Sequence, residues 1–190
     1  METLPFDEEI PAIGLRKDCF QTPPSAVEAI LPMLPKYFTY WEPCAGKGNI
    51  VNTLRENGYK VGGSDIQGGT NYSPFMRLDF LQCSVPDDVT AIITNPPYSL
   101  YGAFIQRCGQ LSLPFALLVP LSFYDAEDRV NAIQAMKGID VIYPSERTAF
   151  ETPTGRKGKD SSPQMLTVWI CKGFYVDLLR QVQGKAVYLR

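Results

Sequence analysis

The chain has 190 residues, 45% of them hydrophobic, and a formal net charge of −2. That length and composition predict one soluble domain with a full core, and no apolar run approaches the roughly 18 residues of a membrane span. The sequence has no histidine. This excludes serine–histidine and cysteine–histidine hydrolases and removes the commonest metal ligand, so we expect no metal site.

Residues 1–18 lack the apolar segment of a secretory signal and are expected to form an extended arm. Five widely spaced cysteines without a Cys-x-x-Cys pair indicate reduced thiols and a cytoplasmic protein. The elements predicted after the arm are helix 25–34, strand 38–41, a tight loop at 46–48, helix 49–57, strand 59–63, loop 66–76, strand 90–94, helix 100–111, strand 115–119, helix 125–137, strand 139–143, a mobile loop at 151–162 and strand 165–171.

The alternation of strands and helices predicts the fold class. Several of the predicted strands are continuously apolar, which is typical of a mostly parallel central sheet with helices on both faces. We find no internal repeat and no second domain. The prediction is therefore a single α/β domain over residues 19–172, followed by a tail at 173–190 that we cannot assign.

The most informative motif is Asn95-Pro96-Pro97-Tyr98, which follows the apolar strand 90–94. Two prolines end a strand because neither has an N–H for the ladder. The turn offers hydrogen-bond acceptors, the Asn95 side-chain oxygen and the Pro96 carbonyl, beside the flat ring of Tyr98. This arrangement suits a planar group that carries an NH2, such as the edge of an adenine.

A second motif, Glu42-Pro43-Cys44-Ala45-Gly46-Lys47-Gly48, lies between a predicted strand and a helix. Ligands bind at such turns in doubly wound sheets, and the glycines allow close approach of the backbone. Val51 stands where a dinucleotide fingerprint needs a third glycine, and the motif is no P-loop. Glu42 would repel a phosphate but attract an ammonium group.

Two further acidic residues follow at informative positions. Asp65 ends the next strand about 20 residues after Gly46, where an acid can accept from ribose hydroxyls. Asp79 could accept from an adenine amino group, and Phe80 could pack on its ring. Together with Glu42, these residues describe a site for an adenosine with a cationic amino-acid tail, which S-adenosylmethionine fits.

With these motifs the chain resembles the class I S-adenosylmethionine-dependent methyltransferases, most closely the N6-adenine DNA methyltransferases of phage and restriction–modification type. Phe20-Gln21-Thr22-Pro23 precedes the glycine motif, and the Asn-Pro-Pro-Tyr motif follows it, an order similar to the gamma arrangement of that family. The resemblance covers roughly residues 18–171. It implies a Rossmann-like fold, S-adenosylmethionine as cofactor, DNA as partner, and a bacterial or phage-infected cell as the setting.

The resemblance also implies roles for individual residues. Asn95, Pro96, Pro97 and Tyr98 would form the catalytic pocket, in which Tyr98 stacks on the flipped target ring. The residues that would contact the cofactor are Phe20, Gln21, Thr22, Pro23, Glu42, Pro43, Ala45, Gly46, Gly48, Asp65, Ile66, Asp79, Phe80 and Asn95. RNA adenine or guanine and a protein glutamine remain alternative substrates, and a non-catalytic nucleic-acid-binding module is an alternative of another class.

The charge distribution points to one further candidate surface. Residues 1–140 have a net charge of −6 and residues 141–190 a net charge of +4. The loop 151–162 holds Arg156, Lys157 and Lys159, which could contact phosphates without reading sequence. An ordinary solvated loop is an equally good interpretation.

Overall fold

The computed structural model of the protein describes residues 20–68, 75–136, 138–144, 147–151, 164–174 and 186–189. Its strands are β1 (Thr39–Glu42), β2 (Lys60–Asp65), β3 (Met76–Arg77), β4 (Ala91–Thr94), β5 (Phe115–Pro120), β6 (Ile139–Pro144), β7 (Thr148–Ala149), β8 (Gln164–Met165), β9 (Thr167–Lys172) and β10 (Ala186–Leu189). Its α-helices are α2 (Pro24–Glu28), α3 (Asn49–Glu56), α4 (Tyr101–Leu111) and α5 (Glu127–Ala135), and its 3₁₀ helices are Leu31–Met33, Tyr98–Leu100 and Leu121–Asp125.

The main sheet has eight strands in the order β10-β6-β9-β5-β4-β1-β2-β3. Pairs from β3 through β2, β1 and β4 to β5 are parallel, whereas β9 runs antiparallel between β5 and β6, and β10 is antiparallel to β6. The expected mostly parallel sheet is therefore confirmed. Because β1, β2 and β4 are parallel, their carboxyl ends meet at one edge, where ligands bind in such sheets.

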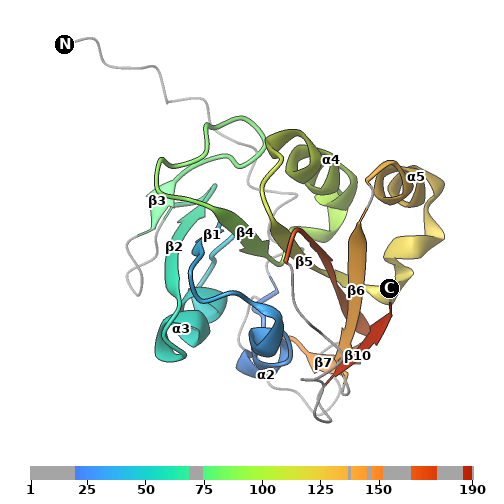
Figure 1. The fold of residues 1–190 in the computed structure, drawn as a ribbon, viewed down its shortest axis with the longest axis horizontal. Coiled ribbons are helices and arrows are strands. Elements are labelled where there is room, and N and C mark those ends of the chain that lie inside the picture. Colours follow the sequence, from blue (N-terminus) through green and yellow to red (C-terminus); the bar gives the residue numbers. More distant parts are fainter. Residues whose placement is uncertain are drawn as a thin grey trace.

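Helices cover both faces of the sheet, as predicted (Figure 1). Side chains alternate along each strand, so Tyr40 of β1 packs toward α2 and α3, while its neighbour Trp41 packs toward α4. The indole of Trp41 donates to Ser64 Oγ (2.9 Å), and the indole of Trp169 donates to the Ala26 carbonyl (2.9 Å). These two buried hydrogen bonds tie β1 to β2 and β9 to α2.

Five elements differ from the sequence-based expectations. The helix expected at 25–34 ends at Glu28 and resumes as a 3₁₀ turn, because Pro32 has no N–H for the Glu28 carbonyl. The short strand β3 extends the sheet inside the expected loop 66–76, and β7 pairs with β8 in a second small sheet. Part of the unassigned tail forms the edge strand β10. No helix among the described residues is long and apolar enough to span a membrane.

Candidate cofactor and target site

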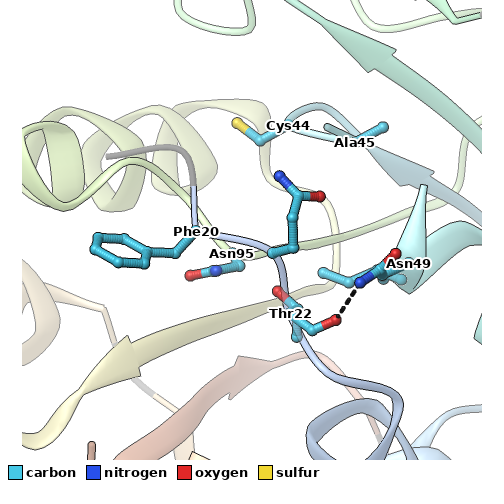
Figure 2. Close-up of a pocket in the computed structure, with 8 residues that line it drawn as sticks. Phe20, Thr22, Cys44, Ala45, Asn49 and Asn95 are labelled. Carbon is cyan, nitrogen blue, oxygen red and sulfur yellow. Dashed lines mark hydrogen bonds between the residues drawn. The ribbon is translucent and has the colours of Figure 1, made fainter. Parts of the chain in front are cut away.

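A cavity lies where the loop after β1 meets the turn after β4, beneath the segment that leads into α2 (Figure 2). β1 and β4 are neighbouring parallel strands, with Trp41 opposite Ile92, so Cys44 and Asn95 emerge side by side. The residues that line the cavity are Phe20, Gln21, Thr22, Cys44, Ala45, Asn49, Ile50 and Asn95. The three motifs singled out in the sequence thus contribute to one site.

The glycine loop has the conformation that its sequence suggests. Gly46 and Gly48 have φ angles of +51° and +89°, a region that residues with a Cβ rarely adopt. Asp65, at the end of β2, accepts the Gly46 N–H through Oδ2 (2.9 Å) and the Gln67 N–H through Oδ1 (2.9 Å). Asp65 therefore holds the loop in place, and the spare lone pairs of its oxygens remain for a ligand.

The segment 20–23 lies against the glycine loop and is hydrogen-bonded to it. Gln21 and Glu151 exchange two backbone hydrogen bonds (3.1 and 3.2 Å), and Gln21 Oε1 accepts the Lys47 N–H (2.9 Å). The Asn49 side chain donates to the Thr22 carbonyl (3.0 Å), as Figure 2 shows. The side chain of Gln21 lies so close to Gly46 that a Cβ there would come within 2.9 Å of its amide. The segment is thus built into the site.

Glu42 lies beneath the loop and is fully buried. Its Oε1 accepts the Cys44 N–H (2.8 Å), while its Oε2 and the neighbouring Thr94 hydroxyl are buried without a protein partner. Burial raises the pKa of Glu42 to about 8, and the hydrogen bond from the Cys44 amide only partly opposes this rise. The unsatisfied oxygen of this buried carboxyl could bind a hydrogen-bond donor or a cation.

Two groups in the cavity define what chemistry it can perform. The Asn95 side-chain oxygen is buried and has no hydrogen-bond partner within the described structure, so it can accept a hydrogen bond from a ligand. The Cys44 thiol also lines the cavity, but burial raises its pKa well above its usual value. Cys44 is therefore a neutral thiol rather than a thiolate nucleophile.

Two aromatic rings stack on Tyr98. Phe20 stacks on Tyr98 with ring centroids 5.2 Å apart and an interplanar angle of 20°. Tyr101 stacks on Tyr98 as well, at 5.4 Å and 28°. A target ring that stacked on Tyr98, as expected, would therefore compete with one of these two side chains for the surface of the Tyr98 ring.

Several of the predicted site residues do not line this cavity. Phe80 does not line the cavity; its ring is buried beside Phe104 (centroids 4.8 Å apart) and Trp41 (5.4 Å), and its contact with adenine stays a prediction. Asp79 accepts the Leu81 N–H (2.9 Å) and caps its own turn. Pro23 begins α2, Pro43 is buried, and Ile66 is half-buried beside Asp65.

The cavity also contains residues that the sequence analysis did not select. Cys44, Asn49 and Ile50 line it, and the first two belong to or follow the glycine motif, so adjacency to that motif was the available signal. Phe75 does not line the cavity, but its ring lies against the glycine loop, where it would meet a Cβ on Gly48 at 3.1 Å. The basic residues Arg156, Lys157 and Lys159 lie outside the described residues, and their contact with nucleic acid stays a prediction.

No protein-family model matches the sequence, and no curated protein sequence matches it at a significant level. Solved structures do resemble it. One, described as a class I S-adenosylmethionine-dependent methyltransferase from Listeria monocytogenes, has a TM-score of 0.54 and 15% identity over 83% of this chain and 62% of its own. Another, described as the modification subunit of a type I restriction enzyme from Vibrio vulnificus YJ016, has a TM-score of 0.52 and 13% identity over 80% of this chain.

A third similar structure is the M protein of the type I restriction enzyme EcoKI, with a TM-score of 0.50 and 14% identity over 80% of this chain. The chain spans 44% of each restriction-enzyme subunit, which is less than two thirds of their length. Identities this low establish the fold alone. The structural similarity and the strand order together show that this chain has the Rossmann-like fold of the class I methyltransferases.

Proposed function

We propose that this protein transfers a methyl group from S-adenosylmethionine to the N6 amino group of adenine in DNA. The observation that carries the proposal is the Asn95 side-chain oxygen, which is buried without a partner in a cavity shared with the glycine loop. A methyl donor on that loop and an NH2-bearing ring at Asn95 would be neighbours. The resemblance of the fold to two restriction-enzyme modification subunits agrees with DNA as the substrate.

The site has features that fit S-adenosylmethionine. The glycine loop lets a ligand approach the backbone, the Asp65 oxygens suit ribose hydroxyls, and the unsatisfied Glu42 carboxyl suits an ammonium group. When bound, the cofactor would supply a methyl group on a sulfonium; the neutral thioether is the leaving group, and the methylated nitrogen would release one proton to solvent. The protein then needs no nucleophile of its own, which agrees with the absence of histidine and with the neutral thiol of Cys44.

The role of Asn95 follows from the chemistry of an aromatic amine. The nitrogen lone pair is delocalised into the ring, which makes the amine a poor nucleophile. Acceptors at the Asn95 oxygen and the Pro96 carbonyl would hold the two N–H groups out of the ring plane and localise the lone pair. Positioning and acceptors placed for developing positive charge are thus the main catalytic devices. A base in a duplex must be flipped out to reach this pocket.

Gly46 offers a test of the cofactor half of the proposal. We expect Gly46→Ala to weaken S-adenosylmethionine binding by about tenfold or more, because the left-handed φ disfavours a side chain by about 1–2 kcal/mol and the new Cβ would meet Gln21. The matched control is Gly62→Ala, whose Cβ would meet nothing within 4 Å. Calorimetric titration of both variants checks this. Equal affinities would show that the loop conformation does not matter for binding.

A transfer assay tests the substrate class. The purified protein is incubated with S-adenosylmethionine carrying a radiolabelled methyl group and, separately, with DNA, RNA and a protein extract. Label in DNA supports the proposal. Label in RNA or protein would redirect it to the alternative acceptors, and binding of DNA without cofactor binding or transfer would indicate a non-catalytic module.

A further inference from the structure

Phe20 and Tyr101 both stack on Tyr98. The stacking distances are 5.2 and 5.4 Å between ring centroids, so a further ring that stacked on Tyr98 would compete with these two side chains. Tyr101 belongs to α4 and is 3% exposed, with its edge against the buried Phe123 (5.7 Å). Phe20 is only partly buried and lines the cavity. Of the two rings, Phe20 is the one that can be displaced without opening the core.

The face that Phe20 covers is also the face that the proposed reaction needs. Phe20 and Asn95 line the same cavity (Figure 2), and the unpartnered Asn95 oxygen is shielded from solvent. A planar ring whose amino group bonds to Asn95 and whose face stacks on Tyr98 must therefore take the position of the Phe20 ring. The resemblance assigned Phe20 to the cofactor, whereas these contacts associate its ring with Tyr98.

We propose that Phe20 occupies the position of the target ring in the empty protein and leaves it when an extruded nucleobase binds. This inference rests on the proposed function and adds a residue that controls access of the substrate. In the empty protein the Phe20 ring stacks on Tyr98, as the base would, and meets the buried Phe150 edge-on at 6.3 Å. A nucleobase in the same position would stack on Tyr98 and present its amino group to Asn95.

The backbone contacts of the next residue provide a pivot for this exchange. Gln21 is held by two hydrogen bonds to Glu151, and the Thr22 carbonyl is held by Asn49. These contacts need not break for the Phe20 side chain to swing out. Phe150 is 1% exposed and also meets Tyr98 edge-on at 6.4 Å, so it stays behind as the wall of the vacated position.

Removing the Phe20 ring should make the position easier to fill. An aromatic pair contributes about 0.5–1.5 kcal/mol beyond its buried area, which corresponds to roughly twofold to tenfold in affinity. We therefore expect Phe20→Ala and Phe20→Leu to lower KM for an adenine-containing single-stranded oligonucleotide by about twofold to tenfold. Because Phe20 also lines the cavity of the proposed cofactor site, S-adenosylmethionine affinity and turnover number are measured in parallel, which separates an effect on the nucleic acid from an effect on the cofactor.

The matched control is Phe38→Leu, because Phe38 is another partly buried ring but packs with Tyr40 and Phe174 away from the cavity; it should leave KM unchanged. Thermal unfolding of each variant checks folding, and Phe20→Leu retains apolar packing if Phe20→Ala does not fold. A raised or unchanged KM in the folded Phe20 variants, or a large loss of cofactor affinity, overturns the inference while the proposed function stands. An unmodified protein that binds cofactor but methylates no nucleic acid overturns both.

Discussion

Replacing Asn95 by alanine is expected to lower the turnover number by about a hundred- to a thousandfold, the usual effect of removing one group that stabilises charge in a transition state. The Asn95 oxygen is buried and unpartnered, so its substitution removes an acceptor that no other described contact uses. Affinity for S-adenosylmethionine should persist, because the backbone contacts of the glycine loop do not involve the Asn95 side chain. Single-turnover kinetics and calorimetric titration separate the two effects.

Two further variants sharpen this test. Asn95→Asp keeps an acceptor of the same size and should retain more activity than Asn95→Ala. Asn57→Ala is the matched control, because the Asn57 side chain donates only to the Thr53 carbonyl at the far end of α3 among the contacts described. If Asn95→Ala loses cofactor binding and turnover together, the turn after β4 has a structural role rather than a catalytic one.

Glu42→Gln is expected to stabilise the fold at alkaline pH and to weaken cofactor binding. The carboxyl of Glu42 has its usual pKa near 4.5 when the chain is unfolded and a pKa of about 8 when it is buried. Between these values the folded state retains a proton that the unfolded state releases. Stability therefore falls as pH rises through this window, at up to about 1.4 kcal/mol per pH unit.

Glutamine removes this dependence because it does not titrate. Its oxygen can still accept the Cys44 N–H, and its NH2 can donate to the Thr94 hydroxyl, which is unpartnered here. Urea unfolding at pH 5 and pH 8 should show a much flatter profile for Glu42→Gln, whereas the exposed control Glu56→Gln should behave like the unmodified protein. Parallel profiles for Glu42→Gln and the unmodified protein would contradict a raised pKa.

The same variant tests the proposed ammonium contact. A bound ammonium group would favour the ionised form of Glu42, and a hydrogen bond to a charged group contributes about 1.5–3 kcal/mol, so replacing this carboxyl by an amide, which cannot ionise, should weaken S-adenosylmethionine binding by roughly tenfold to a hundredfold. A stabilised protein with lower affinity would mean that the buried carboxyl is kept for binding at the expense of stability. Unchanged affinity would restrict Glu42 to holding the Cys44 amide.

Most of the sheet could be predicted because its strands have strong local signals. The runs that form β4 and β5 are continuously apolar, and Pro96 and Pro97 mark where β4 ends. The two-residue strands β3, β7 and β8 are too short for a periodic pattern. β10 was also missed, because its pairing with β6 is an antiparallel contact between distant parts of the chain, which no local pattern encodes.

The site shows the same division between local and tertiary information. The glycine motif and Asn95 were found because their residue types are unusual at strand ends, and the structure brings them into one cavity. The packing of Phe80 on Phe104 could not be predicted, because a phenylalanine in the core and one facing a ligand look alike in sequence. The stacking of Phe20 on Tyr98 joins residues 78 positions apart and was equally inaccessible.

The most direct test of the account is to identify the methylated product. The protein is incubated with DNA of varied sequence and S-adenosylmethionine whose methyl group carries deuterium, and the DNA is digested to nucleosides for mass spectrometry. The account predicts N6-methyladenine with the deuterated methyl group, and its loss with Asn95→Ala. Deuterated methyl groups on another nucleoside only, or none on DNA while the protein binds the cofactor, would contradict the proposed function.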